Sequence, residues 1–322
     1  GKNHGFVMFM DWSGSMHWNL METLKQLFSL CLFCKQIGVP FEVYAFKDCD
    51  ADVPFSYLGK QNVIRGSNLV LRNFLSSRMN IEEMNFAMSV LWAAGCRQNI
   101  NSDGLSGTPL NDAIMIAPKV VQDFTDRNRL EITNVVWLTD GGSNGANGLE
   151  NNTTPRGNYG QRGKNSRFFY VDPETNKTYD WEPYNWSGTE QNTNTLLRIL
   201  KDRTNCNLVG FFLYERSNFK IVDRDFAISN GNPEAFEKAR KFWLANKFYP
   251  VKSAGYDEYY IIDTASMKDT ANNLDIDNSG EKKMTVKKMA SAFSKFAAKK
   301  SVNRVLLRNF VERISGHSKK VA

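Results

Sequence analysis

The chain has 322 residues, which is enough for one large domain or for one domain with an elaborate insertion. Its hydrophobic content of 42% and aromatic content of 12% are typical of a globular protein with a core. No apolar run approaches the roughly 20 residues that span a bilayer, and nothing at the start resembles a signal peptide, so we predict a cytoplasmic location and no membrane contact.

In the first half of the chain, we predict strands over 6–10, 41–46 and 135–138, and helices over 18–37, 67–77, 81–94 and from Pro109 to 124. A hairpin with strands over 167–171 and 177–181 follows. After it we predict a helix over 195–203, a strand over 208–214, a helix over 233–247 and a strand over 259–262. Strands separated by helices predict an α/β fold with a doubly wound, mainly parallel sheet.

The domain organisation follows from composition. We expect one α/β domain over 1–268, interrupted at 141–192 by a Gly- and Asn-rich insertion that contains the hairpin. A polar linker over 269–284 then leads to a basic, amphipathic helical tail over 285–322. The tail either packs against the sheet or binds a partner. Because Gly1 stands one short step before the first strand, we also expect a fragment of a longer protein or a tag remnant.

The five cysteines are odd in number and irregularly spaced, which argues against a disulfide framework and for a reducing compartment. Cys31 and Cys34 form a CxxC pair inside an apolar, helix-like run. There is no second pair and no nearby His, so we do not expect zinc or redox chemistry there.

Three short stretches carry the chemistry, and each lies where a predicted strand ends or a helix begins. They are Asp11-Trp12-Ser13-Gly14-Ser15, Gly107-Thr108-Pro109-Leu110 and Leu138-Thr139-Asp140-Gly141-Gly142. Each alone is a common cap or turn. Together they offer two carboxylates and three hydroxyls, which are the hard oxygen ligands that Mg²⁺ prefers. Ligands of doubly wound sheets bind beyond the carboxyl ends of the strands, where Asp11 and Asp140 stand.

This combination resembles the metal-ion-dependent adhesion site of von Willebrand factor A (vWA) domains. The resemblance covers roughly Phe6 to Ile262, apart from the insertions. It implies a site for Mg²⁺ (or Mn²⁺ or Ca²⁺) whose ligands are Ser13, Ser15 and Thr108, together with Asp11 and Asp140, which bind directly or through water. A metal held by only two carboxylates can accept an Asp or Glu from a partner protein. The residues expected to contact that partner are Trp12, His17, Gly141 and Gly142.

The form of the Gly107–Leu110 stretch is most similar to intracellular vWA proteins that work with AAA+ ATPases, such as the large subunit of cobaltochelatase and the partners of MoxR-type ATPases. The resemblance therefore implies a non-catalytic adaptor or substrate-recognition subunit. The chain has no G-x-x-x-x-G-K-[ST] phosphate loop and no G-x-S-x-G elbow, so we expect no enzyme activity of its own. The insertion and the basic tail match no particular subfamily.

Three alternatives stay open. The net charge of +7 suits nucleic acid, and Ro-type ribonucleoproteins also carry a vWA domain. Binding that weakens steeply with salt but ignores EDTA would favour that alternative. A metal-chelatase subunit would need a tetrapyrrole and further subunits. An extracellular adhesin is disfavoured by the missing signal peptide and the odd cysteine count.

Overall fold

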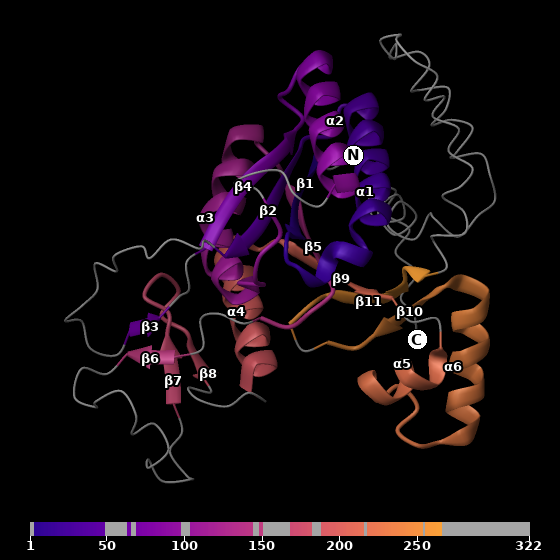
Figure 1. The fold of residues 1–322 in the computed structure, drawn as a ribbon. Helices are drawn as coiled ribbons and strands as arrows, with labels where there is room; N and C mark the ends of the chain where they lie inside the picture. Colours follow the sequence, from indigo (N-terminus) through magenta and orange to yellow (C-terminus); the bar gives the residue numbers. More distant parts are fainter. Residues whose placement is uncertain are drawn as a thin grey trace, which may run out of the picture.

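The computed structural model describes residues 3–48, 63–65, 69–97, 104–143, 148–150, 168–181, 188–215, 218–253 and 255–265. Its centre is a seven-stranded sheet with the strand order β10-β11-β9-β5-β1-β2-β4 (Figure 1). The strands are β1 (His4–Asp11), β2 (Phe41–Asp48), β4 (Leu69–Ser76), β5 (Ile132–Thr139), β9 (Asn207–Tyr214), β10 (Phe248–Val251) and β11 (Glu258–Asp263). Five of them run parallel, while β4 and β10 at the two edges are antiparallel to their neighbours. The predicted fold class is confirmed.

Helices cover both faces of this sheet (Figure 1). They are the 3-10 helix η1 (Ser15–Trp18), α1 (Leu20–Ile37), α2 (Ile81–Arg97), α3 (Leu110–Asn128), α4 (Gly188–Thr204), α5 (Phe219–Phe226) and α6 (Pro233–Asn246). One core lies between the sheet and α1 with α2, and a second lies between the sheet and α3 with α4. A third, smaller core joins α5 and α6 to the β10–β11 edge.

Strand β1 shows why this sequence forms a central strand. Phe6, Met8 and Met10 pack toward α1 and α2, whereas Val7 and Phe9 pack toward α3 and α4. All five side chains are at most 1% exposed. A strand covered on both faces needs apolar residues at every position, so it appears in the sequence as an unbroken apolar run.

Two small antiparallel sheets accompany the main one. Strand β3 (Val63–Arg65) pairs with β6 (Gly148–Glu150), and β7 (Phe168–Val171) pairs with β8 (Thr178–Trp181). The β7–β8 pair is the predicted hairpin. The β3–β6 pair was not predicted, because three-residue strands give no usable periodicity.

The predicted helix over 67–77 is wrong, because residues 69–76 form strand β4. This strand pairs antiparallel with β2, with a register shift between Val43 and Tyr44. Its sequence, LVLRNFLS, has too few polar residues to show a clear period, and the local pattern favoured a helix. The open edge of β2 and the two flanking cores decided the outcome, as tertiary context often does for short apolar runs.

Other elements differ less. Helix α4 begins at Gly188, inside the predicted insertion, and α5 and β10 were not predicted. Pro250 lies in β10, an edge strand that pairs only with β11, so its missing N–H leaves no ladder position empty. The linker over 269–284 and the tail over 285–322 lie outside the described residues.

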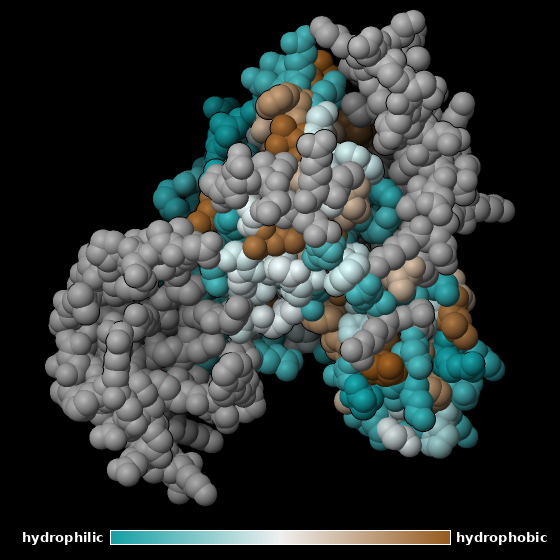
Figure 2. All heavy atoms as spheres, in the orientation of Figure 1, coloured by the Kyte–Doolittle hydropathy of each residue, from teal (hydrophilic) through white to brown (hydrophobic). Residues whose placement is uncertain are grey.

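The surface in Figure 2 is mixed in character. Over α5 and α6 it is mostly hydrophilic, with separate hydrophobic residues; the exposed large apolar side chains on α6 are Phe242 and Leu244. Scattered apolar residues of this kind are ordinary for a folded protein. Within the described residues, no helix is both long enough and apolar enough to cross a membrane.

Candidate metal centre

The two carboxylates of the predicted site stand at the ends of adjacent central strands. Without the edge strand β10, the main sheet has the order β4-β2-β1-β5-β9-β11. If these six strands are numbered 1 to 6 along the chain, this is the order 3-2-1-4-5-6 of doubly wound folds, which reverses direction between β1 and β5. Met10 of β1 lies opposite Leu138 of β5. Asp11 and Asp140 therefore follow that pair on neighbouring strands, at the edge where such sheets bind ligands.

The loop after β1 is held to the loop before α3 by backbone hydrogen bonds. Ser13 forms an isolated parallel bridge with Ser106. The Gly14 N–H donates to the Ser106 carbonyl oxygen over 2.7 Å, and the Ser106 N–H donates to the Trp12 carbonyl oxygen over 3.3 Å. This pairing brings the loop that carries Thr108, which is 7% exposed, to the loop that carries the two serines.

The second serine links the loop after β1 to Asp140. The hydroxyls of Ser13 and Ser15 lie 3.0 Å apart. The Ser15 hydroxyl donates to Oδ1 of Asp140 over 2.7 Å. The structure thus joins three of the five predicted metal ligands in one hydrogen-bonded chain, although Ser15 and Asp140 are 125 residues apart in sequence.

Asp11 is buried and only half satisfied. Its Oδ2 accepts a hydrogen bond from the Thr139 hydroxyl over 2.7 Å, but Oδ1 is buried and has no hydrogen-bond partner among the described residues. Burial raises the pKa of Asp11 to about 7, although the hydrogen bond from Thr139 and weaker interactions with the hydroxyl and backbone of Ser13 oppose that shift. The nearby charge of Asp140 raises the pKa further. A buried carboxylate with an unused oxygen is costly unless a cation or a proton is present.

Asp140 is half-buried, and both of its oxygens accept hydrogen bonds. Ser15 donates to Oδ1, and the Asn19 side-chain amide donates to Oδ2 over 3.3 Å. Burial raises the pKa of Asp140, the hydrogen bonds from Ser15 and Asn19 oppose that shift, and the charge of Glu215 just after β9 adds to it. Asp11 and Asp140 therefore both favour a positive charge between them.

These residues fit a hard divalent ion. Among the described residues, no three His, Cys, Asp or Glu side chains form a metal-binding group, so a site here must use hydroxyls as well as carboxylates. Mg²⁺ accepts such a set, because it takes oxygen ligands and retains several waters. The unpartnered Oδ1 of Asp11 and the paired serine hydroxyls are the oxygens that the structure offers for it.

The residues predicted to contact a partner fall into two groups. Trp12 is 3% exposed and packs edge-on against Phe74, so its indole belongs to the core rather than to an exposed surface. His17 is half-buried and contacts Trp18, whose side chain is 63% exposed. Among the described residues, no atom lies within 4 Å of a Cβ built at Gly141 or Gly142.

Three residues of this centre were not singled out from the sequence. Asn19 and Thr139 bind the two carboxylates, and Thr264 in turn binds Asn19 over 2.5 Å. Thr139 stands inside a quoted motif and could have been found from the register of β1 with β5. Asn19 and Thr264 carry no local signal, because their link exists only after the sheet forms.

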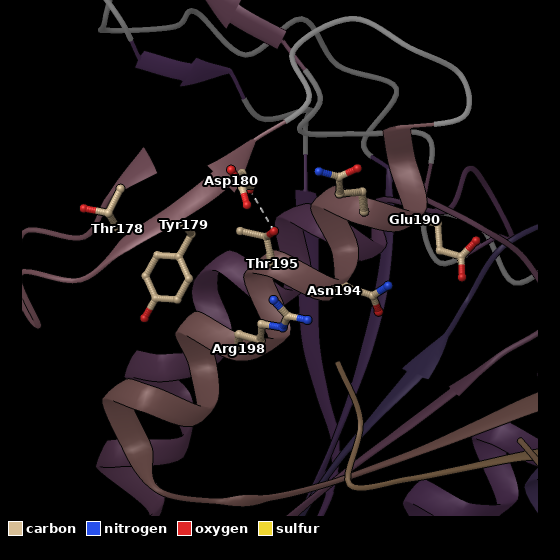
Figure 3. Close-up of a pocket in the computed structure, with 8 residues that line it drawn as sticks. Thr178, Tyr179, Asp180, Glu190, Asn194, Thr195 and Arg198 are labelled. Carbon is tan, nitrogen blue, oxygen red and sulfur yellow. Dashed lines mark hydrogen bonds between the residues drawn. The ribbon is translucent and has the colours of Figure 1, made fainter. Parts of the chain in front are cut away.

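A polar cavity of about 480 Å³ lies elsewhere, between β8 and α4 (Figure 3). Its lining residues are Thr178, Tyr179, Asp180, Glu190, Gln191, Asn194, Thr195 and Arg198. The Thr195 hydroxyl donates to the Asp180 carbonyl oxygen over 3.0 Å. No predicted metal ligand lines this cavity, so it is separate from the candidate metal centre.

The cysteines described by the structure take no part in either site. Cys31, Cys34 and Cys206 are free and buried. Burial raises the pKa of the Cys31 thiol well above its ordinary value. Buried thiols with a raised pKa are poor nucleophiles.

Comparison with known proteins gives structural likenesses only. No family model matches this chain, and no curated protein matches its sequence. The open conformation of the pilus adhesin SpaC from Lactobacillus rhamnosus GG is 16% identical and superposes with a TM-score of 0.40, covering 85% of this chain and 30% of the adhesin chain. Proximal thread matrix protein 1 from the mussel byssus is 9% identical with a TM-score of 0.31, covering 66% of this chain and 38% of that one.

A third structure, three N-terminal domains of the type V pili tip protein Mfa5 from Porphyromonas gingivalis, is 12% identical with a TM-score of 0.26 and covers 44% of this chain and 20% of that one. This chain spans less than a third of the length of the SpaC adhesin chain. At such identities and TM-scores, these likenesses say nothing about what this chain binds.

Proposed function

We propose that this chain is a non-catalytic interaction module of the vWA type that holds Mg²⁺ at the ends of β1 and β5 and captures a carboxylate of a partner protein there. Asp11, Ser13, Ser15, Thr108 and Asp140 would hold the ion, directly or through water. Bound there, the metal would supply a positive centre with a coordination position for an Asp or Glu side chain of the partner.

The observation that carries this proposal is the buried, unpartnered Oδ1 of Asp11. A carboxylate in the interior normally has every oxygen hydrogen-bonded or neutralised. Here Thr139 donates to Oδ2, Oδ1 has no hydrogen-bond partner among the described residues, and Ser13 contributes only weaker stabilising interactions. The second carboxylate, Asp140, increases the electrostatic cost. A divalent cation would bind the unpartnered oxygen and would also neutralise the repulsion between the two carboxylates.

The surroundings suit capture of a partner rather than chemistry on a substrate. His17 and Trp18, two and three residues after Ser15 in η1, form an aromatic rim. Gly141 and Gly142 leave open space on the side of Asp140. A protein segment could therefore approach the metal with its carboxylate and pack neighbouring residues on the exposed Trp18 side chain.

For the partner we retain the expectation of a AAA+ ATPase or its substrate, which rests on the form of the Gly107–Leu110 loop alone. In that role the chain would act as an adaptor, and the hydrolysis of ATP would occur on another polypeptide. The nucleic-acid alternative rests on the basic tail, which lies outside the described residues.

Two measurements, made one after the other, test the proposal. The purified chain is first titrated with MgCl₂ and MnCl₂ by calorimetry, alongside Asp11→Ala and the control Asp126→Ala, which changes an exposed aspartate of α3. We expect binding by the wild-type chain and the control, and none by Asp11→Ala, with circular dichroism showing that all three are folded.

Affinity capture from the native cell extract follows, in Mg²⁺ and in EDTA, with the same three proteins. A partner retained only in Mg²⁺ and only by the wild-type chain and the control would support the proposal. Absence of metal binding by the wild-type chain, or retention that ignores both EDTA and Asp11→Ala, would overturn it. Retained nucleic acid whose binding falls steeply with salt would favour the alternative.

A further inference from the structure

Asn19 connects the candidate metal centre to the end of the last sheet strand. Its side-chain amide donates to Oδ2 of Asp140 over 3.3 Å, and its amide oxygen accepts from the Thr264 hydroxyl over 2.5 Å. Asn19 is 3% exposed and Thr264 is 1% exposed. The link therefore runs through the protein interior, and it joins residues 245 positions apart in sequence.

The backbone on each side of this link is fixed. The Asn19 N–H donates to the Met16 carbonyl oxygen, and its own carbonyl oxygen accepts from both the N–H and the hydroxyl of Thr23. Thr264 follows β11, and its N–H donates to the Tyr214 carbonyl oxygen at the end of β9 over 3.0 Å. The side chains of Asn19 and Thr264 are therefore already held in place before a metal binds.

The direction of the Asn19 amide matters chemically. If the amide were turned the other way, its oxygen would face the Asp140 carboxylate, and two acceptors would repel each other. The Thr264 hydroxyl lies 2.5 Å from the amide oxygen of Asn19 and 3.1 Å from the Tyr214 carbonyl oxygen, so the shorter contact, to Asn19, is the main acceptor of its single proton. That donation keeps the NH₂ group of Asn19 on the Asp140 side. Donors on Asp140 also favour its ionised form, which is the form that binds a metal.

We infer that Asn19 and Thr264 are positioning residues of the metal centre, through which the end of β11 sets the orientation of Asp140. This inference rests on the proposed function. Its basis is the pair of buried hydrogen bonds, together with the position of Asp140 beside Ser15. Asn19 is a partner that binds a ligand rather than the metal, and removing such a partner typically changes metal affinity by about 10–100-fold. Thr264 acts one step further away, through Asn19, so its effect should lie at the lower end of that range.

The test compares two substitutions at one position in the full chain. Thr264→Val keeps the shape of the side chain but removes the hydroxyl, and Thr264→Ser keeps the hydroxyl. Thr133→Val is the matched control, because Thr133 is also a buried threonine, 5% exposed, but it lies at the opposite end of β5 from Asp140. The probe is Mn²⁺ alone, followed by titration calorimetry and electron paramagnetic resonance.

We expect Thr264→Val to weaken Mn²⁺ binding by about tenfold, while Thr264→Ser and Thr133→Val bind like the wild-type chain. The rise in melting temperature on adding Mn²⁺ should shrink for Thr264→Val alone. If Thr264→Val does not fold, Asn19→Ala replaces it with the same expectation.

Two results would overturn the inference while the proposed function stands. One is wild-type affinity in Thr264→Val, and the other is an equal loss in Thr133→Val, which would reflect general destabilisation. A wild-type chain that binds no Mn²⁺ at all would overturn the inference and the proposed function together.

Discussion

The hydroxyl of Thr139, the last residue of β5, donates to Oδ2 of Asp11, the last residue of β1, over 2.7 Å. The two strands are parallel neighbours in the sheet, so this bond ties together the two strand ends from which the carboxylates project. It also decides which oxygen of Asp11 stays available. With Oδ2 engaged, the buried Oδ1 is the oxygen left for a cation.

Asp11→Asn should therefore abolish metal binding without lowering the stability of the metal-free chain. The amide keeps the shape of Asp11 but removes the buried charge, which is costly in the interior without a cation beside it. We expect the metal-free variant to be at least as stable as the wild-type chain in urea denaturation, and to show no Mg²⁺ binding by calorimetry. A clear loss of stability in EDTA would mean that Asp11 supports the fold through contacts that need its charge.

The pH dependence should follow from the same group. Burial raises the pKa of Asp11 to about 7 in the folded, metal-free chain, whereas the unfolded chain has the ordinary value of 3.8. Between those values the folded state binds more protons than the unfolded state, so stability in EDTA should fall as the pH rises from about 4 to about 7. Melting temperatures over this range would measure the decline.

Saturating Mg²⁺ should flatten that decline, because the ion favours the ionised carboxylate, and metal affinity should increase with pH up to about 8. Asp11→Asn supplies the control, since it should have a weaker pH dependence in EDTA than the wild-type chain. Identical profiles for the two proteins would show that Asp11 does not carry the buried charge.

Much of this centre was accessible from the sequence, for a definite physical reason. Asp11 directly follows a continuous apolar run, and Asp140 follows another after a single threonine. Such runs identify strands covered on both faces. Parallel strands end at one edge, so the two carboxylates could be placed together before any coordinates were known. The hydroxyls of Ser13 and Ser15 came with the same loop.

What the sequence did not predict depends on contacts between distant segments. Strand β4 exists because β2 offers an open edge, and Asn19 faces Asp140 only because Thr264 arrives from the end of β11. Trp12 illustrates the same limit. Its neighbours Asp11 and Ser13 belong to the site, but its own side chain turns into the core against Phe74.

A different buried carboxylate anchors the β7–β8 hairpin to α4. Asp172 is fully buried and accepts hydrogen bonds from Arg203, including one from Nε over 3.1 Å, and from Thr175. Burial raises the pKa of Asp172, but the hydrogen bonds from Arg203, Thr175 and the Glu174 N–H outweigh that effect and lower it to about 2. This pair holds the turn of the hairpin rather than any ligand.

Asp172→Asn should destabilise the chain by about 3 kcal/mol at neutral pH, because it leaves the Arg203 charge poorly compensated. The depressed pKa predicts stability that is present above about pH 4 and is lost as the pH falls toward 2. Urea denaturation at several pH values measures both effects. Glu174→Gln is the control: Glu174 also pairs with Arg203 but is 65% exposed, so its loss should cost less than about 1 kcal/mol.

Gly210 and Gly141 offer a last pair of substitutions. The first tests how tightly the sheet is packed, and the second tests whether the metal centre has room for an added methyl group. A Cβ at Gly210 in β9 would lie 2.4 Å from Cδ2 of Tyr259 and 2.9 Å from Cε1 of Tyr256, two stacked rings with little room to move. A Cβ at Gly141 would meet no atom within 4 Å in the part of the chain that the structure describes. Gly210→Ala should therefore cost about 1–3 kcal/mol of unfolding free energy, as overpacking usually does.

Gly141→Ala should leave both stability and Mg²⁺ affinity close to the wild-type values, because one methyl group reaches no neighbour. Urea denaturation and calorimetry on both variants provide the check. A stable Gly210→Ala would mean that Tyr256 and Tyr259 can separate, and so that this edge of the sheet is looser than its contacts indicate. A large loss of Mg²⁺ affinity in Gly141→Ala would mean instead that the ion, or the loop around it, approaches the chain at Gly141 itself.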